Sequence, residues 1–222
     1  MNLDAITTRI IAAARQANRD PASVRLVAVS KFHPQEAVVE VLKAGHYLFG
    51  ENRVQEAVAK FAPLRAAYPS IELHLIGPLQ TNKAEEAVRH FDVIEVLDRP
   101  KLAEALAAAM RKTGRSVPCY IEINSGAEPQ KAGILPEALP DFLRLCCDDY
   151  GLPITGLMCI PPQGDDPRPH FRRLKELADQ HALPNISMGM SADFESAIQE
   201  GSTEVRIGTA IFGERTKKSV DI

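Results

Sequence analysis

Apolar and polar residues alternate in blocks along the chain. Leu3, Ile6 and Ile10 repeat at helical spacing, which predicts a helix over about the first seventeen residues. Eight short and nearly continuous apolar runs follow, and runs of this length between turn residues are typical of buried strands. The runs are VRLVAVSK (24–31), YLFGE (47–51), ELHLIG (72–77), VIEVLD (93–98), PCYIEIN (118–124), ITGLMCI (154–160), NISMGM (185–190) and EVRIGTAIFG (204–213).

The segments between the runs carry helix signals. Pro34, Pro100 and Pro136 stand where helices begin, and Gly45 and Gly201 stand where helices end. Strands that alternate with helices pair in parallel, and strands covered by helices on both faces are apolar throughout. The pattern therefore predicts a parallel α/β fold.

Eight strand–helix repeats predict a (β/α)8 barrel of the TIM type, preceded by the N-terminal helix. The alternative is a doubly wound open sheet. The count of eight favours the barrel, as does the lack of a GxGxxG turn after the first run. The chain has no linker rich in Gly, Ser or Pro, so we expect a single domain over residues 1–222.

Composition narrows the class of partner. The 222 residues are 45% hydrophobic and 25% charged, as in an ordinary globular protein. A net charge of −3, no basic block and no Trp argue against a nucleic-acid partner. With no signal-peptide pattern and no long apolar span, we expect a cytoplasmic protein that does not bind membranes.

The four cysteines, Cys119, Cys146, Cys147 and Cys159, contain no CxxC pair and no paired His spacing. They predict neither a disulfide framework nor a metal site, and we expect reduced, mostly buried thiols.

Candidate chemistry gathers where the predicted strands end, because barrel active sites lie at the carboxyl ends of the strands. Lys31 ends the first apolar run. A strand-end lysine either extends into solvent or is used chemically. Desolvation lowers the pKa of a lysine, and a neutral amine attacks a carbonyl carbon to form a Schiff base.

The last two runs suggest an anion site. Ser191 precedes a predicted helix, and Gly208 and Thr209 offer a close backbone approach and a second hydroxyl. Barrels often bind phosphate between the loops after strands seven and eight. The alternative is structural, with Ser191 as a helix N-cap and Gly208 as a strand glycine.

Four stretches, LVAVSK, FGENRVQE, HLIGPLQTNK and SMGMSADFESAIQEGSTEVRIGTAIFGER, strongly resemble the pyridoxal phosphate homeostasis protein family. These single-domain, fold-type III barrels are related to the N-terminal domain of alanine racemase, and the resemblance spans residues 24–215. It implies that pyridoxal 5′-phosphate (PLP) is held as an aldimine on Lys31. It also implies a monomer that carries or buffers PLP inside the cell, with PLP-dependent apo-enzymes as recipients.

The resemblance also gives roles to individual residues. Ser191, Gly208 and Thr209 match phosphate-binding positions, Asn52 matches an asparagine beside the cofactor ring, and Arg206 matches the arginine that faces the pyridine nitrogen. From the sequence alone, Arg206 is a strand-end charge that seeks solvent or a salt bridge. A guanidinium does not give up its proton, so the ring is a weak electron sink.

Two enzymatic alternatives remain. One is a fold-type III amino-acid racemase or weak transaminase that uses the same aldimine, and the other is a Schiff-base aldolase without cofactor. Related racemases take a second base from a tyrosine of a subunit with an additional domain. None of Tyr47, Tyr68, Tyr120 and Tyr150 lies at a predicted strand end. We therefore expect binding rather than an established catalytic activity.

Several residues allow two interpretations. Phe32, His33 and Arg53 depart from the family pattern: Phe32 could narrow the approach to Lys31, and His33 is either a proton carrier or an exposed loop residue. His74 is expected to line the barrel as a hydrogen-bonding residue, and Lys83 to begin a surface helix. Either could instead face the cofactor cavity.

Overall fold

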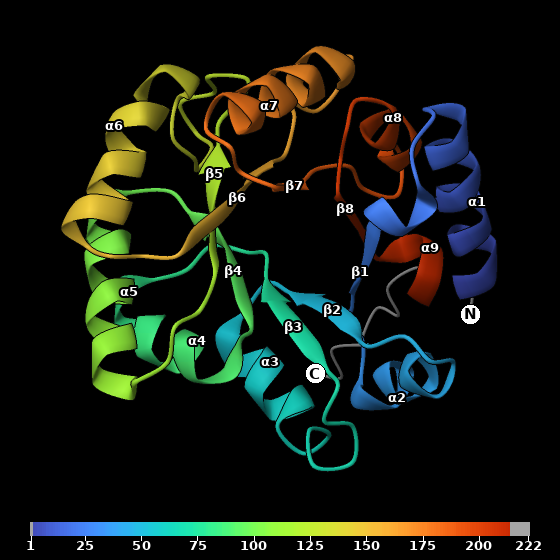
Figure 1. The fold of residues 1–222 in the computed structure, drawn as a ribbon. Coiled ribbons are helices and arrows are strands. Elements are labelled where there is room, and N and C mark those ends of the chain that lie inside the picture. Colours follow the sequence, from blue (N-terminus) through green and yellow to red (C-terminus); the bar gives the residue numbers. More distant parts are fainter. Residues whose placement is uncertain (1, 214–222) are drawn as a thin grey trace, which may run out of the picture.

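The apolar runs form eight parallel strands that close into a barrel (Figure 1). The computed structural model describes residues 2–213. Each strand pairs with the next in chain order, and β8 pairs with β1 to complete the ring. The strands are β1 (Arg25–Val29), β2 (Leu48–Glu51), β3 (Glu72–Leu75), β4 (Val93–Leu97), β5 (Cys119–Ile123), β6 (Ile154–Cys159), β7 (Asn185–Ser187) and β8 (Glu204–Ile207).

The helices of the described residues surround the strands (Figure 1). They are α1 (Leu3–Gln16), α2 (Gln35–Lys43), α3 (Val54–Phe61), α4 (Ala84–His90), α5 (Pro100–Thr113), α6 (Leu139–Arg144), α7 (Arg168–Gln180), α8 (Phe194–Gln199) and α9 (Thr209–Phe212). The predicted barrel with a preceding helix is confirmed. The predicted single domain over 1–222 reaches beyond the described residues and stays a prediction. Within residues 2–213, no helix combines the length and apolar character that crossing a membrane requires.

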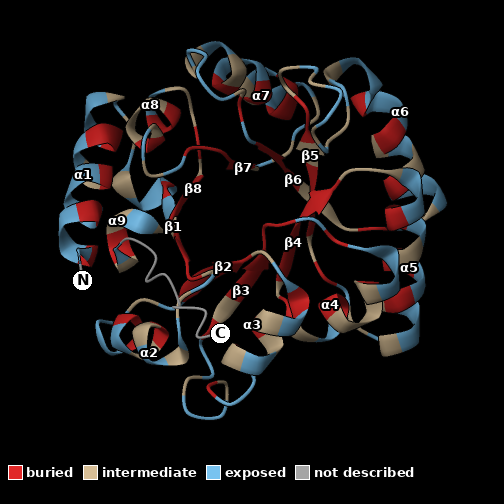
Figure 2. Cartoon of the chain, turned by 180° about the vertical axis from the view of Figure 1, so that it is seen from behind, coloured by how far each residue is buried: buried red, intermediate tan, exposed pale blue. Residues whose placement is uncertain are grey.

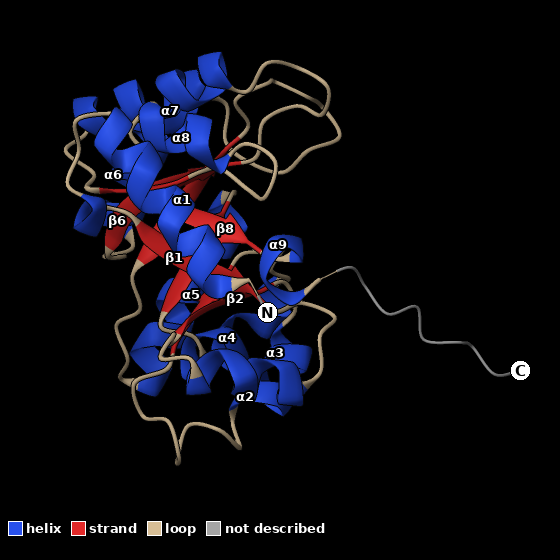
Figure 3. Ribbon diagram, turned by 90° about the vertical axis from the view of Figure 1, so that its right-hand side faces the viewer, coloured by secondary structure: helices blue, strands red, loops and turns tan. Residues whose placement is uncertain are grey.

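Helix α1 packs beside α8, outside strands β1 and β8 (Figure 1 and Figure 3). Its predicted apolar face is buried at Leu3, Ile6 and Ile10. On its outer side, the guanidinium of Arg9 donates two hydrogen bonds of 2.9 Å to the carboxylate of Glu195. The extra helix thus contacts α8 and α9, the helices that follow β7 and β8.

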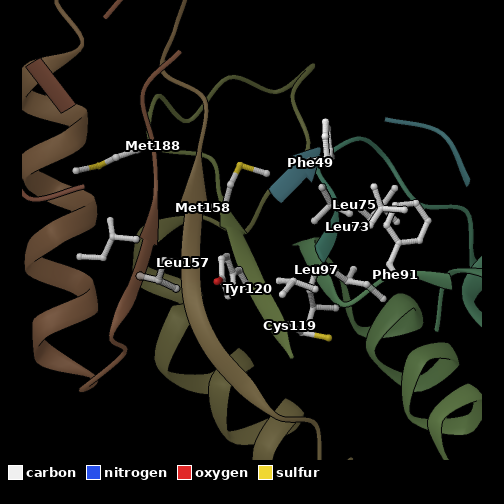
Figure 4. Close-up of a cluster of buried hydrophobic side chains, with 14 of the residues drawn as sticks. Phe49, Leu73, Leu75, Phe91, Leu97, Cys119, Tyr120, Leu157, Met158 and Met188 are labelled. Atoms are coloured by element: carbon white, nitrogen blue, oxygen red, sulfur yellow. The ribbon is translucent and has the colours of Figure 1, made fainter. Parts of the chain in front are cut away.

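The apolar core lies between the strands and the helices. Buried residues cover the strands and the helix faces turned towards them (Figure 2). Figure 4 shows part of this core, where Leu73, Leu75, Phe91 and Leu97 gather around β3 and β4. Polar and charged side chains are also buried, and they include His74, Glu95, Ser187, Glu204 and Arg206.

The last two strands are shorter than the predicted 185–190 and 204–213. After β8, the N–H groups of Ile211 and Phe212 donate to the backbone oxygen of Gly208, and residues 209–212 form the short helix α9. An apolar run alone does not distinguish a strand from a buried helical turn. Thr209 therefore begins a helix rather than extending the strand, and Gly208 lies between the two elements. Residues 214 and 215 of the quoted family motif lie outside the described part.

Candidate functional site

The sequence-predicted site residues follow or end four strands that are neighbours in the barrel. Strands β2, β1, β8 and β7 are consecutive around the closed ring. Because all strands are parallel, their carboxyl ends meet at one opening of the barrel. The structure thus gathers all six residues in one sector of that opening: Asn52 after β2, Lys31 after β1, Arg206 on β8, Gly208 and Thr209 after β8, and Ser191 after β7.

Lys31 is half-buried in a tight turn at the end of β1. The N–H of His33 donates to the backbone oxygen of Ser30, and Phe32 has a positive φ of 65°. Phe32 is 51% exposed, and its ring centroid lies 5.9 Å from the guanidinium carbon of Arg53. Two departures from the family pattern therefore contact each other beside Lys31.

His33, the third departure, is half-buried and stacks on Phe212, with the two ring centroids 5.0 Å apart. This contact joins the Lys31 turn to α9, which follows β8. The interpretation of His33 as an exposed loop residue is thus wrong in part, because the ring packs on α9. A role as a proton carrier stays a prediction.

The buried ion pair of Lys60 and Glu51 contacts the turn that carries Lys31. The hydroxyl of Ser30 donates to Oε1 of Glu51 at 2.7 Å. The ammonium of Lys60, on α3, lies 2.6 Å from the same oxygen and 2.7 Å from the backbone oxygen of Ser30. The role of Lys60 is not evident from the sequence, because nothing in its helical pattern sets it apart from a surface lysine.

The expected phosphate segments lie close to the end of β1. A Cβ placed on Gly208 would come within 3.1 Å of the backbone oxygen of Val29, so glycine permits a close approach of the two strand ends. Thr209 is exposed as the first residue of α9, and the first N–H groups of a helix have no partner within the helix.

Ser191 is half-buried in the turn between β7 and α8. The N-cap of α8 is Asp193, whose carboxylate accepts a hydrogen bond of 2.6 Å from the N–H of Met190. The structural alternative, Ser191 as an N-cap, is therefore wrong. The turn thus follows the carboxyl end of β7, the strand that pairs with β8.

Arg206 is buried inside the barrel with only 4% of its surface exposed. One guanidinium nitrogen, Nη1, donates to the hydroxyl of Ser187 at 2.6 Å, and Nη2 donates to the backbone oxygen of Cys159 at 2.8 Å. The alternative that Arg206 extends into solvent is wrong. Its nearest carboxylate oxygen, Oε2 of Glu95, is 3.9 Å from Nη1.

A chain of charged side chains continues from this point through the barrel. Glu95 accepts hydrogen bonds from Ser187 and from Nδ1 of His74, which is 2.7 Å away, while Nε2 of His74 lies 3.0 Å from Glu72. Burial alone would lower the pKa of His74, but Glu72 and Glu95 outweigh it and raise the pKa to about 9. The predicted barrel-lining role of His74 is confirmed.

Glu204 joins the same interior. Its Oε1 accepts hydrogen bonds from Tyr120 at 3.1 Å and from Arg25 at 3.2 Å, and burial raises its pKa to about 7. His74, Glu95 and Glu204 present metal-ligand atoms within 4.8 Å of one another. Both ring nitrogens of His74 are already engaged by carboxylates, so the geometry is that of an ion-pair network.

A cavity of about 240 Å³ opens beside Asn52 at the same end of the barrel. Its walls include Asn52, Gly77, Glu122 and Asn124. Burial raises the pKa of Glu122 to about 7, and the nearby Asp98 adds to this effect. The buried Oδ1 of Asn52 has no hydrogen-bond partner among the described residues, so it is available to a ligand.

The Lys83 side chain and the cysteine thiols take no part in the contacts described above. Lys83 ends a 3-10 turn before α4 and pairs with Glu86 at 3.1 Å, so its predicted surface position is confirmed. All four cysteines are free; Cys119, Cys146 and Cys159 are buried and Cys147 is exposed, as predicted for reduced and mostly buried thiols.

Residues 1–216 match the family described as Alanine racemase, N-terminal domain. The pyridoxal phosphate homeostasis protein of Aquifex aeolicus (strain VF5) is 40% identical over 222 residues, which cover 96% of each protein. The structure of PipY from Synechococcus elongatus PCC7942 with PLP bound is 38% identical, with a TM-score of 0.77. It covers 94% of this chain and 100% of the PipY chain.

Alanine racemase of Clostridium difficile 630 covers 94% of this chain with a TM-score of 0.65, but this chain covers only 56% of the racemase. At 13% identity, that likeness shows the barrel fold alone. The match to the Aquifex aeolicus protein, by contrast, extends over nearly the full length of both chains. This chain belongs to the pyridoxal phosphate homeostasis protein family, within the wider family defined by the N-terminal domain of alanine racemase.

Proposed function

We propose that this protein binds PLP covalently through Lys31 and acts as a carrier or buffer of the cofactor. The observation that carries the proposal is the gathering of Lys31, Arg206 and the turns after β7 and β8 at one barrel opening. The PLP-bound structure of PipY, at 38% identity, supports the choice of ligand.

The side chains fit this cofactor. Lys31 supplies an amine at the end of β1, and Oδ1 of Asn52 is a buried acceptor without a donor among residues 2–213. Arg206 supplies a fixed cation in a buried place. Gly208 keeps the backbone after β8 close to β1, and the first N–H groups of α9, which have no partner within the helix, supply donors for an anion in our proposal.

Bound PLP supplies an aldehyde that joins amines reversibly and a ring that withdraws electrons. In our proposal, Ser191, Gly208 and Thr209 hold the phosphate and Asn52 lies beside the ring. Arg206 donates a hydrogen bond towards the pyridine nitrogen and keeps its own proton, because guanidinium is always charged in proteins. Such a site binds the cofactor firmly while giving little support to a carbanion.

The racemase alternative needs a tyrosine as second base, and no tyrosine of the described residues lies at the barrel opening. Tyr120 is buried inside the barrel and donates to Glu204. Tyr47, Tyr68 and Tyr150 lie in segments that lead into β2, β3 and β6, at the opposite end of the barrel. We therefore propose binding and release of PLP, rather than racemisation or transamination, as the function.

We extend the proposal to the protein's setting. The protein works as a cytoplasmic monomer, and its cargo passes to PLP-dependent apo-enzymes. The Lys31 turn suits such exchange, because Lys31 and the neighbouring Phe32 are both accessible to solvent.

The test is covalent attachment. Wild type, Lys31→Ala and the control Lys83→Ala are mixed with PLP, and absorbance is recorded from about 300 to 500 nm before borohydride reduction and peptide mass mapping. We expect wild type and Lys83→Ala to show the same new band, with the reduced adduct on Lys31. A band that persists in Lys31→Ala, or an adduct on another lysine, would contradict the proposal.

A further inference from the structure

Arg206 is connected through Ser187 to Glu95, an acidic residue of a distant strand. Glu95 lies on β4, whereas Ser187 and Arg206 lie on β7 and β8. Their contacts therefore cross the interior of the barrel rather than follow one sheet edge. Resting on the proposed function, we infer that Glu95 is a positioning residue that fixes Arg206 through Ser187 and offsets the positive charge that Arg206 presents to the cofactor.

The hydrogen bonds have a defined direction. A serine hydroxyl has one proton, and Ser187 donates it to Glu95 while accepting from Nη1 of Arg206. The backbone oxygen of Cys159 holds Nη2. A planar guanidinium fixed at two nitrogens has one orientation, so each of its remaining N–H donors has a fixed direction. Glu95 sets that orientation because it determines which way the Ser187 hydroxyl points.

Glu95 is kept ionised by the groups around it. Burial would raise the pKa of its carboxyl, but the hydrogen bond from His74 lowers it. His74 is in turn paired with Glu72 on its other nitrogen. The remaining charges near Glu95 are Arg206 and the carboxyl of Glu204. Arg206 thus faces the cofactor as one half of a nearly neutral pair rather than as an isolated cation.

The negative charge of Glu95 should change the pH at which the bound cofactor titrates, which packing of the Glu95 side chain alone would not do. An isolated cation facing the cofactor would favour loss of the proton from Nζ of Lys31 when that atom is joined to PLP. A carboxylate behind the cation opposes that effect. The pH at which the bound cofactor changes its absorbance therefore reports the charge of Glu95.

The experiment compares wild type, Glu95→Gln and Glu204→Gln, each loaded with PLP and titrated with the absorbance of the bound cofactor as the readout. Gln keeps the size of Glu95 and removes its charge. We expect the transition of Glu95→Gln to move to lower pH by about half a unit or more. Glu204→Gln makes the same change next to His74 without contacting Arg206, and its transition should move less.

Ser187→Ala is the second variant, because it keeps the charge of Glu95 and removes the bridge. We expect it to bind PLP several-fold more weakly, since one hydrogen bond contributes about 1 kcal/mol, with a transition close to that of wild type. Three outcomes would overturn the inference about Glu95 and leave the proposed function standing. They are an unchanged transition in Glu95→Gln, a shift of that transition equal to the shift in Glu204→Gln, and an unchanged PLP affinity in Ser187→Ala. A wild-type protein that takes up no PLP would overturn the proposed function as well.

Discussion

The ammonium group of Lys60 lies 2.6 Å from Oε1 of Glu51, and both side chains are largely buried between α3 and the end of β2. The same ammonium holds the backbone oxygen of Ser30, the residue before Lys31. Helix α3 is therefore attached directly to the turn that carries the proposed cofactor lysine.

Removing the charge of Lys60 should destabilise the fold. In Lys60→Met, Glu51 keeps a buried charge without its partner, so we expect the free energy of unfolding to fall by about 3–5 kcal/mol. Urea denaturation measures this change. Lys43→Met is the matched control, because Lys43 and Glu40 form an exposed pair and little change is expected there. If both variants changed the free energy of unfolding equally, the buried pair would contribute no more to stability than the exposed pair.

Gly77→Ala should weaken PLP binding although Gly77 carries no side chain. A Cβ at Gly77 would lie 2.6 Å from Cα and from the backbone oxygen of Asn52, so Asn52 must move. Spectroscopic titration with PLP should show reduced affinity. Gly114→Ala strains a left-handed turn at the end of α5, where a Cβ meets open space. That variant should lose about 1 kcal/mol of stability and keep its affinity; unchanged affinity in Gly77→Ala would refute the prediction.

Stability should fall as the pH rises, because of two interior groups, Glu204 and His74. The pKa of His74 is raised from 6.5 to about 9, so its contribution is complete below pH 6.5 and is lost as the pH rises through 9. The pKa of Glu204 is raised from 4.5 to about 7, so its contribution is complete below pH 4.5 and is lost as the pH rises through 7.

Thermal unfolding across this range tests both groups. Relative to wild type, Glu204→Gln should gain in Tm as the pH rises from 4.5 to above 7, because Gln has no proton to lose.

On the acid side, hydrogen bonding to His74 lowers the pKa of Glu72 from 4.5 to about 2, so wild-type stability should also fall between these values as the pH decreases. A Tm of wild type that stays level from pH 6.5 to above 9 would contradict the assignment.

Truncating the outer core should destabilise the barrel without a specific effect on the site. Phe91 is fully buried among Leu73, Leu75 and Leu97 (Figure 4), and Phe91→Ala should lower the free energy of unfolding by about 3–5 kcal/mol. Leu135 is 41% exposed, so Leu135→Ala serves as the control and should change stability little. Chemical denaturation compares the two, and similar losses would argue against the packing seen around Phe91.

The barrel and the position of the site could be predicted from sequence for a simple reason. Alternation of apolar runs and helices implies parallel strands, and parallel strands present all their carboxyl ends at one opening. Lys31 and Arg206 are 175 positions apart in the chain, yet strand order alone brings β1 and β8 together. The roles of single residues in holding PLP came only from the family resemblance.

The supporting interactions could not be predicted in the same way. Glu95 sits within an apolar run, and its partners come from β3, β7 and β8, so no local period indicates them. Lys60 has the spacing of an ordinary helix residue. The sequence pattern predicts an end of β8 that is too late, because residues 209–212 are equally compatible with a strand and with a buried turn of helix.

The closure of the barrel also limits how other molecules can attach. Each of the eight strands has a partner on both sides, so the sheet presents no open edge to an additional strand. Association by sheet extension, which is also a route to aggregation, is therefore blocked. In the proposed function, a recipient protein would have to approach over the loops and helix ends around the barrel opening, and the shape of those loops would then select the recipient.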